Sequence, residues 1–346
     1  MQRIAIIDPS SRSLPYDFYY IQEVSKSYLV DFYCSNTVFN ERYIDKIKKL
    51  NNVNVIKADI SNVSKSKGVF NYLLLLIKIT FKKYSHIHFQ WYIFLVIEFL
   101  FFIILRNKLV ITFHNVKPHS YYKEFYFPNF ILKTLASKII FISNYVQNEF
   151  IEIYGKPKKH YLVNHGVFPL NTSNEKVINK KRELIFWGNI KPYKGVDVFK
   201  SLIKSSSFNS CSFRIYGKWD SSLLDLKNEL SDKCFIVDEY LSEQELLKLL
   251  HTDSVFIIPY ENASQSGILY SLLGANRVFI STDKGDNGFF LKKYGLEKLL
   301  FNKENISSIL NAMNHALNNY DMISSKLKEI KSDFLWENID YKNIYN

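Results

Sequence analysis

The sequence lacks the short motifs that identify a catalytic or structural site by themselves. Its three cysteines, Cys34, Cys211 and Cys234, are scattered over 346 residues with no Cys-x-x-Cys spacing. This argues against a disulfide framework and against a structural zinc site, and it fits a reducing cytoplasm. GxSxG, HExxH, P-loop and complete GxGxxG motifs are also missing, so no single motif assigns a chemistry.

No apolar run is long enough for a membrane span. The longest, Trp91–Leu105, has 15 residues with Glu98 in its middle, whereas a span needs about 20 residues with few charges. A second run, Tyr72–Ile79, is shorter and is followed by lysines. Both predict helices packed against a core, and a helix lying at a bilayer surface is the alternative. The opening segment, Met1–Asp8, lacks the apolar region of a signal peptide and predicts a strand.

Acidic residues are scarce in the first half of the chain. Residues 1–160 hold 22 Lys and Arg against 11 Asp and Glu, while residues 161–346 hold 23 against 22, so the first half carries almost all of the net charge of +12. This asymmetry indicates an anionic partner. No nucleic-acid module is recognisable, so we expect no nucleic acid and favour an anionic membrane face or a lipid-linked pyrophosphate. A solvated basic surface without a specific partner is the alternative.

Short apolar runs alternate with amphipathic segments along the chain. In the second half the strand-like runs are 184–187, 213–216, 234–237, 255–259 and 278–281, and helix-like runs occupy 196–205, 222–230, 243–250 and 267–273. In the first half the strand-like runs are 4–7, 30–33, 53–57, 86–89, 109–113, 139–142 and 160–163. Such alternation predicts βαβ units with parallel sheets. We therefore expect an α/β protein with two Rossmann-like domains, residues 1–168 and 182–325, joined by a polar stretch over 170–181. Ligands of such sheets bind beyond the carboxyl ends of the strands, which places the expected site in a cleft between facing domains.

The most informative segment, Phe186–Asp197, joins an expected strand to an expected helix. It carries Gly188, Asn189, Lys191 and Lys194. Glycine lets the backbone approach a ligand closely, and lysines beside a helix N-terminus favour an anion, for which a diphosphate is the best candidate. An ordinary loop with surface lysines has the same composition and remains the alternative.

A second segment, Glu261–Tyr270, follows another expected strand. Ser266 and Gly267, with Ile268 next to them, open a helix whose free N–H groups form a second anion site. A plain serine N-cap without a ligand is the alternative. Glu261, at the strand end, either binds a ribose hydroxyl pair or is a loop carboxylate in water.

Polar residues follow other strand ends as well. Gly217 and Lys218 come after the run 213–216, and His114 and His165 come after strands of the first half. Because all these ends face one cleft, they are functional candidates, although each histidine can equally be a hydrogen-bonded structural residue.

Together these segments resemble the donor-binding domain of GT-B glycosyltransferases, most of all the GT4-type group (glycosyl transferases group 1). The segments that carry the resemblance are Phe186–Asp197, Gly217-Lys218, Glu261–Leu273 and Thr282–Gly288. Upstream, the T-x-H-N/D loop, the V-x-S element and the I-P-x-G/H-G junction of that group are similar to Thr112–Asn115, Phe141–Ser143 and Val163–Gly166. Trp336–Asn338 resembles the W-E-x-I of its terminal helix, which implies that residues 326–346 return to the first domain.

The resemblance implies transfer of a sugar from a nucleotide-sugar substrate, a UDP- or GDP-sugar, with no further cofactor. Lys191 and Lys194 would grip the donor diphosphate, Gly188 would keep its loop close to it, and Ser266-Gly267 would lie beneath it. His114 would lie near the transferred sugar and, with Lys194, would act in catalysis. No Asp-x-Asp pair is present to hold a metal ion, so lysines and helix ends would neutralise the diphosphate alone.

The same resemblance implies bacterial surface polysaccharide assembly (O-antigen, capsule or exopolysaccharide). The acceptor would be an undecaprenyl-diphosphate-linked glycan, and the enzyme would be peripheral on the inner face of the cytoplasmic membrane. Retention of configuration is favoured on family grounds, while inversion would need a general base, for which His114 and Asp17 are candidates.

The chain departs from the group's pattern at two places. Asn189 replaces the usual arginine, so Lys191 would substitute for it, and Leu272 stands where the second glutamate of E-x7-E is expected. These departures keep two alternatives open. One is a non-catalytic GT-B partner protein, and the other is a sugar-nucleotide epimerase of the same fold, which would convert the donor without an acceptor.

Overall fold

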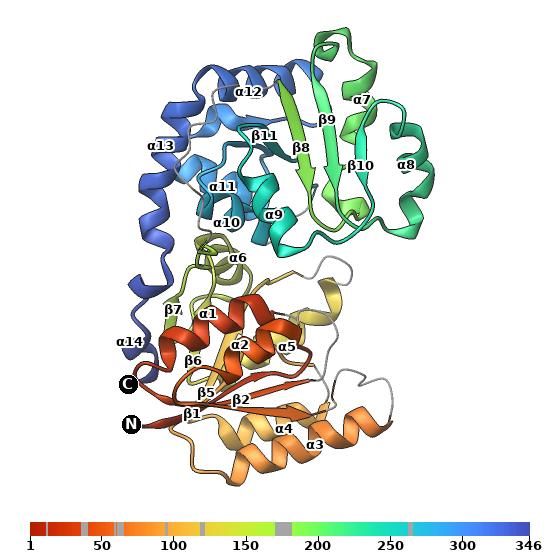
Figure 1. Ribbon diagram of the computed structural model, residues 1–346. Helices are drawn as coiled ribbons and strands as arrows, with labels where there is room; N and C mark the ends of the chain where they lie inside the picture. The colour runs from red at the N-terminus through yellow and green to blue at the C-terminus, as the bar shows by residue number, and fades with distance from the viewer. Residues whose placement is uncertain are drawn as a thin grey trace. The chain divides into compact units, whose positions relative to one another are not determined.

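The chain folds into two α/β units, and each contains one sheet. The computed structural model describes residues 1–11, 13–35, 41–58, 60, 66–93, 96–117, 122–169, 182–261 and 266–346. Unit 1 comprises Met1–Gly166 and Leu335–Asn346, and unit 2 comprises Val167–Phe334 (Figure 1). The expected domain junction over 170–181 and the residues 262–265 of the second motif lie outside the described residues.

Unit 1 has a seven-stranded parallel sheet in the order β3-β2-β1-β4-β5-β6-β7. Its strands are β1 (Arg3–Asp8), β2 (Leu29–Ser35), β3 (Val53–Ala58), β4 (His86–Phe89), β5 (Leu109–Phe113), β6 (Lys138–Phe141) and β7 (His160–Leu162). Its helices are α1 (Leu14–Val24), α2 (Glu41–Lys48), α3 (Ser66–Phe81), α4 (Val96–Leu105), α5 (Tyr122–Leu135), α6 (Asn144–Tyr154) and α14 (Tyr341–Tyr345). In Figure 1, α3 and α4 cover the face of this sheet opposite α1 and α2.

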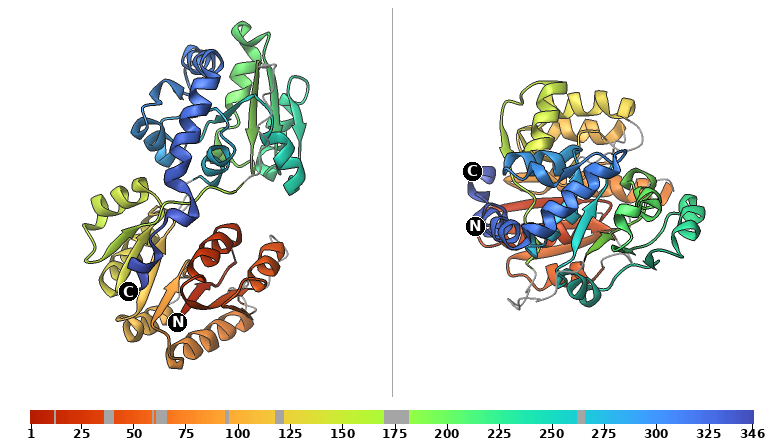
Figure 2. Two further views of the ribbon diagram at one scale, coloured as in Figure 1. Left: turned by 60° about the vertical axis from the view of Figure 1, so that its left-hand side comes forward. Right: turned by 90° about the horizontal axis from the view of Figure 1, so that it is seen from above.

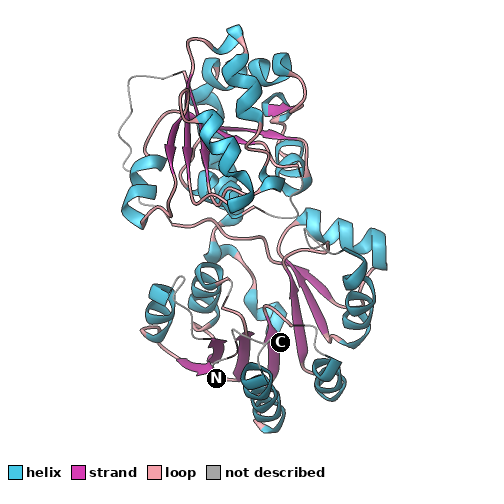
Figure 3. Cartoon of the chain, turned by 90° about the vertical axis from the view of Figure 1, so that its right-hand side faces the viewer, coloured by secondary structure: helices cyan, strands magenta, loops and turns pink. Residues whose placement is uncertain are grey.

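Unit 2 has a six-stranded parallel sheet in the order β10-β9-β8-β11-β12-β13. Its strands are β8 (Glu183–Trp187), β9 (Ser212–Tyr216), β10 (Phe235–Val237), β11 (Val255–Ile258), β12 (Phe279–Thr282) and β13 (Leu300–Phe301). Its α-helices are α7 (Val198–Lys204), α8 (Leu224–Leu230), α9 (Glu243–Leu250), α10 (Gly267–Gly274), α11 (Gly285–Lys293), α12 (Ile306–Asn318) and α13 (Tyr320–Ile330), and a 3-10 turn, η1, covers Pro192–Lys194. Figure 3 shows the helices on both faces of each sheet.

Burial explains why the strands could be located from the sequence. Strands of a parallel sheet that is covered on both faces form continuous apolar runs, and Ile4, Ala5, Ile6 and Ile7 of β1 are all fully buried. Each expected strand is present within two residues of its predicted bounds. The strand β13 was missed because a run of two residues carries no pattern.

The C-terminal segment that belongs to unit 1 begins at Leu335. Gly166 leaves room for the Trp336 indole, whose ring a Cβ on that glycine would approach to 2.3 Å. Farther along, the Tyr345 hydroxyl and the His88 Nδ1 lie 2.6 Å apart, and Lys138 donates to the Ile344 carbonyl at 2.7 Å. These contacts hold α14 against the first sheet, as Figure 2 shows.

The two long apolar runs of unit 1 form α4 and α3, and the expectation of core packing is confirmed for only one face of each. Phe102 of α4 and Leu76 of α3 are fully buried, whereas Ile104 of α4 and Phe70 of α3 are 65% and 59% exposed. No helix in the described part of the chain has the length and hydrophobicity required to cross a membrane.

Candidate active site

The two glycine-bearing segments singled out in the sequence follow neighbouring strands at the point where the strand order of unit 2 reverses. From β8 the chain proceeds outward to β9 and β10, and then returns to β11 on the other side of β8. In open parallel sheets, ligands bind at the carboxyl ends of the strands that flank such a reversal. The segment after β8 begins at Gly188, and the segment after β11 contains Glu261 and leads to Ser266.

The turn after β8 is built by two glycines in backbone contact. Gly188 has φ +129° and donates its N–H to the Tyr216 carbonyl at 3.0 Å. Gly217, after β9, has φ +140°, and a Cβ on it would lie 1.9 Å from the Gly188 carbonyl oxygen. Any side chain at position 217 would therefore displace the backbone of the β8 turn.

The next residues join this turn to the end of β11. Gly195 ends η1 in the left-handed region with φ +67°, and a Cβ there would lie 2.0 Å from the Pro259 carbonyl oxygen. The Glu261 N–H donates to the Tyr193 carbonyl at 2.9 Å. Contacts between backbone atoms alone therefore hold the two segments next to each other.

Lys194 lies at the centre of this arrangement. Its Nζ is 3.4 Å from the position that a Cβ on Gly188 would occupy, and that position is 2.6 Å from Cδ1 of Ile268. The same ammonium lies 5.2 Å from the centroid of the Tyr260 ring, at a distance where a cation is attracted to the ring face. Gly188, Lys194 and Ile268, all predicted site residues, are therefore brought together.

The Lys194 ammonium has no carboxylate within ion-pair distance among the described residues. Burial, with the Lys191 charge as the second cause, lowers its pKa to about 8. A partly buried cation without a counter-ion costs free energy, and an anionic ligand would remove that cost. Lys191 and Asn189 are both exposed nearby, and Lys191 is likewise without an ion pair among the residues described.

The N-terminus of α10 completes the cluster. Ser266 is 4% exposed, and its side chain caps no backbone N–H of α10. Burial raises the pKa of the neighbouring Tyr260 hydroxyl, and a side-chain hydrogen bond with Ser266 opposes that rise. A Cβ on Gly267 would meet nothing within 4 Å in the described structure. Within the described residues, the helix N-terminus therefore has free space beside Gly267 and retains the unsatisfied backbone N–H groups that an anion site requires.

Two predicted site residues already have counter-ions. Lys218 pairs with Asp238 at 3.3 Å. Glu261 pairs with Lys303, which also contacts Asp197 at 3.0 Å. Roles of Lys218 at the phosphates and of Glu261 at a ribose remain predictions, and each would require its ion pair to be shared or exchanged.

The sequence did not point to Tyr260 or Lys303. Tyr260 directly follows the predicted strand 255–259, and its ring lies against the Lys194 ammonium. Lys303 follows β13, so recognition of that strand would have placed a lysine at one more carboxyl end. Because β13 has only two residues and forms no recognisable apolar run, nothing in the sequence marked Lys303 as a residue at a strand end.

His114, in unit 1, directly follows β5 and is 8% exposed. Its ring stacks on Trp91 with centroids 4.5 Å apart, and Tyr16 lies edge-on to it at 5.1 Å. Burial, with His165 as the second cause, lowers the pKa of His114 to about 3. Its Nε2 is buried without a hydrogen-bond partner among the described residues. The His114 imidazole is therefore neutral near pH 7. It carries no charge, but its Nε2 can donate or accept one hydrogen bond.

The Asp17 carboxylate is buried in the same unit, and both its oxygens lack a hydrogen bond within the described ranges. Burial, reinforced by the Asp8 charge, raises the pKa of Asp17 well above its usual range. Within those ranges, no group of three or more His, Cys, Asp or Glu side chains could hold a metal ion.

Comparison with known proteins identifies the fold. No protein-family model matches the chain, and no curated protein matches its sequence. Among solved structures, HepE from Anabaena in complex with UDP and glucose superposes with a TM-score of 0.75 at 15% identity, covering 99% of this chain and 98% of that one. Sucrose-phosphate synthase from Thermosynechococcus elongatus gives 0.72 at 14% identity (100% and 98% covered), and a glycosyltransferase from Rickettsia africae gives 0.70 at 15% (99% and 97%). The chain has the GT-B fold, which confirms the predicted fold class.

Proposed function

We propose that the protein is a glycosyltransferase that takes its sugar from a nucleotide-sugar donor bound by unit 2. The observation that carries the proposal is the uncompensated, partly buried Lys194 ammonium beside Gly188, at the reversal of the strand order. A UDP-sugar is the first choice of donor, since a structure of the same fold holds UDP and glucose, and a GDP-sugar is the second. The GT4-type assignment rests on the sequence resemblance.

The donor diphosphate would bind between Lys194, Lys191 and the N-terminus of α10 at Ser266-Gly267. As the glycosidic bond to the leaving phosphate breaks, negative charge grows on the diphosphate, and preorganised donors stabilise it most at that moment. These groups would do so without a divalent ion. Donor binding would also remove the cost of burying the Lys194 charge, so that residue contributes to affinity as well as to rate.

For the acceptor we propose a lipid-linked, undecaprenyl-diphosphate glycan of bacterial surface polysaccharide synthesis, bound by unit 1. Support comes from the excess of basic residues in the first half of the chain, and the protein would work on the inner face of the cytoplasmic membrane. The neutral His114 would hydrogen-bond a sugar hydroxyl. Retention of configuration is proposed from the resemblance. If the reaction inverts, it would need a general base, for which His114 and Asp17 are the candidates.

A thermal-shift screen against UDP-, GDP-, dTDP- and CMP-sugars tests the donor assignment. A ligand at 100 times its dissociation constant stabilises the folded state by about 2.7 kcal/mol, which is a shift of several degrees. We expect the largest shift with a UDP-sugar. The absence of a shift with all four donors would contradict a nucleotide-sugar site.

Donor affinity should depend on pH in a way that reports Lys194. Binding of the diphosphate requires the ammonium form, so affinity is full below the free-state pKa of about 8 and falls as pH rises through it. An ordinary lysine, with a pKa near 10.4, would show no such fall in this range. We expect UDP affinity to decrease about tenfold between pH 7 and pH 9 in titration calorimetry.

Lys194→Arg is the matched control for this pH dependence, because a guanidinium stays charged throughout the range. The variant should bind UDP with an affinity that is nearly constant from pH 7 to 9. An equal decrease of UDP affinity in wild type and Lys194→Arg would mean that another group titrates, and would contradict the role of Lys194 in the pH dependence.

A further inference from the structure

The helices α3 and α4 pack against each other on unit 1. The Tyr72 hydroxyl of α3 donates to the buried Glu98 carboxylate of α4, and the Ile93 N–H, just before α4, donates to the same carboxylate at 3.1 Å. Tyr72 is fully buried and Leu105 is 1% exposed, so the inner sides of both helices belong to the core. This polar link fixes the two helices as a pair and leaves their outer sides facing away from the core.

The outer sides are large, apolar and exposed. On α3 they follow an i, i+4, i+7, i+11 stripe and on α4 an i, i+4, i+7, i+8 stripe, spacings that place them on one side of a helix. The residues of this α3–α4 face are Phe70, Leu74, Ile77, Phe81, Val96, Leu100, Ile103 and Ile104. Phe81 and Val96 are 84% and 85% exposed. Eight large exposed apolar side chains on two paired helices indicate an interaction site rather than ordinary solvent-facing surface.

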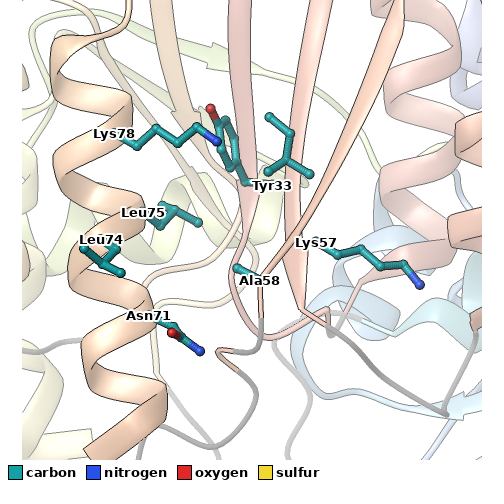
Figure 4. A pocket seen from close by; sticks show the side chains of 8 residues that line it. Tyr33, Lys57, Ala58, Asn71, Leu74, Leu75 and Lys78 are labelled. Atoms are coloured by element: carbon teal, nitrogen blue, oxygen red, sulfur yellow. The ribbon is translucent and has the colours of Figure 1, made fainter.

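The surface beside Leu74 is hollowed as well. A pocket of about 280 Å³ lies between α3 and the strands β2 and β3. Figure 4 shows Leu74, Leu75 and Lys78 projecting from α3 on one side of it, with Tyr33 and Lys57 across from them. Leu74 thus belongs both to the α3–α4 face and to an apolar recess, which has Lys78 on one side and Lys57, paired with Glu41, on the other.

The exposed charges on the two helices and directly after them have one sign. Lys67, Lys78, Lys83 and Arg106 are exposed and without an ion pair among the residues that the structure describes. The only acidic residue on either helix is Glu98, and it is buried. An isologous dimer through this face would bring these cations together, whereas an anionic lipid surface would neutralise them.

We propose that the α3–α4 face docks on an anionic bilayer, with its apolar side chains among the acyl-chain ends and its cations at the lipid phosphates. Helices with an apolar face and cationic flanks bind in the plane of the interface in this way. The inference deepens the proposed function, on whose membrane-bound acceptor it rests. It places the first domain's membrane contact on two helices rather than on basic charge spread over the domain.

Flotation of the full chain with vesicles tests the docking without any donor or turnover. Wild type should bind vesicles of 70% phosphatidylcholine and 30% phosphatidylglycerol, and less as salt rises. The double variant Phe81→Ser/Ile104→Ser should lower partitioning at least tenfold, since two large apolar side chains no longer leave water. Lys67→Gln and Lys83→Gln should each lower it about fivefold.

Leu224→Ser/Met322→Ser is the matched control, because both residues are exposed apolar side chains of unit 2. It should leave partitioning unchanged. Equal binding by the α3–α4 variant and wild type would overturn the proposal, as would wild type that does not float. A dimer in sedimentation that the Phe81→Ser/Ile104→Ser variant abolishes, without vesicle binding, would show a second copy as the occupant and also overturn it.

The docking of the α3–α4 face and the proposed glycosyltransferase function can be contradicted independently of each other. If the protein floats as described yet transfers no sugar, the docking face stands and the proposed function fails. If it transfers sugar to a short-chain, water-soluble acceptor yet does not float, the function stands and the docking face fails.

Discussion

Replacing Lys194 by alanine is expected to lower sugar transfer from the donor by about two to three orders of magnitude, the loss seen when one preorganised donor is removed from a developing anion. Lys194 is the charged group closest to the Gly188 turn and to Ile268 at the start of α10, and Lys191 is more exposed. The remaining lysine and the helix N-terminus would hold the diphosphate weakly. Initial rates at saturating acceptor, together with UDP binding by calorimetry, measure the effect.

The loss should not come from unfolding. Because burial lowers the folded-state pKa of Lys194 to about 8, the unfolded chain binds its proton more tightly than the folded one. The free energy of unfolding therefore increases as pH rises from about 8 toward 10.4, because the folded chain has lost this proton while the unfolded chain still holds it. At pH 7 Lys194 is charged in both states, and the burial of its charge lowers the stability of the folded state. Lys194→Met should accordingly be at least as stable as wild type at pH 7 in urea denaturation.

Lys204→Ala provides the matched control for charge, since Lys204 is a 69% exposed lysine of α7 in the same unit. We expect it to retain transfer and UDP binding. Wild-type rates in Lys194→Ala would contradict the diphosphate assignment. A variant that unfolds would instead show that the residue is structural.

Gly217→Ala is expected to destabilise unit 2 by about 3 kcal/mol or more. The new Cβ would lie 1.9 Å from the Gly188 carbonyl oxygen, and φ +140° is a conformation that alanine adopts only under strain. Since both atoms belong to rigid turns at strand ends, neither can move without breaking the hydrogen bond from Gly188 to Tyr216. Urea denaturation followed by tryptophan fluorescence gives the change in unfolding free energy.

Gly267→Ala is the matched control for Gly217→Ala, and we expect it to preserve the stability of unit 2. Its Cβ, at the first turn of α10, would meet no atom of the described residues within 4 Å, so stability should stay within about 1 kcal/mol of wild type or rise slightly. Donor affinity should nevertheless fall, because a methyl group would occupy the place where the diphosphate approaches the helix N-terminus. Equal stability of the two variants would contradict the described packing of the β8 and β9 turns.

Much of the fold could be predicted because burial leaves a pattern in a parallel sheet. Continuous apolar runs located every strand except β13, whose two residues are too few to form a run. The positions of Gly188 and Ser266 could be predicted because each follows such a run. Their proximity could not, since it depends on the strand order β8-β11, which places two segments some 70 residues apart in sequence at adjacent strand ends.

The ion-pair partners of the site residues could not be predicted from the sequence for a related reason. Lys218 and Glu261 were expected as free site residues, but Asp238 and Lys303 come from loops after other strands and reach them only in the folded sheet. The outer faces of α3 and α4 could not be told from the inner ones either, because both faces of each helix carry large apolar side chains.

Hydrogen exchange with and without UDP tests the central claim most directly. A diphosphate bound as proposed would protect the backbone amides of Gly267 and Ile268 at the start of α10, together with those between Gly188 and Gly195. Unit 1 would remain unchanged in the absence of an acceptor. Protection confined to other segments, or none at saturating UDP, would contradict the donor site described for unit 2.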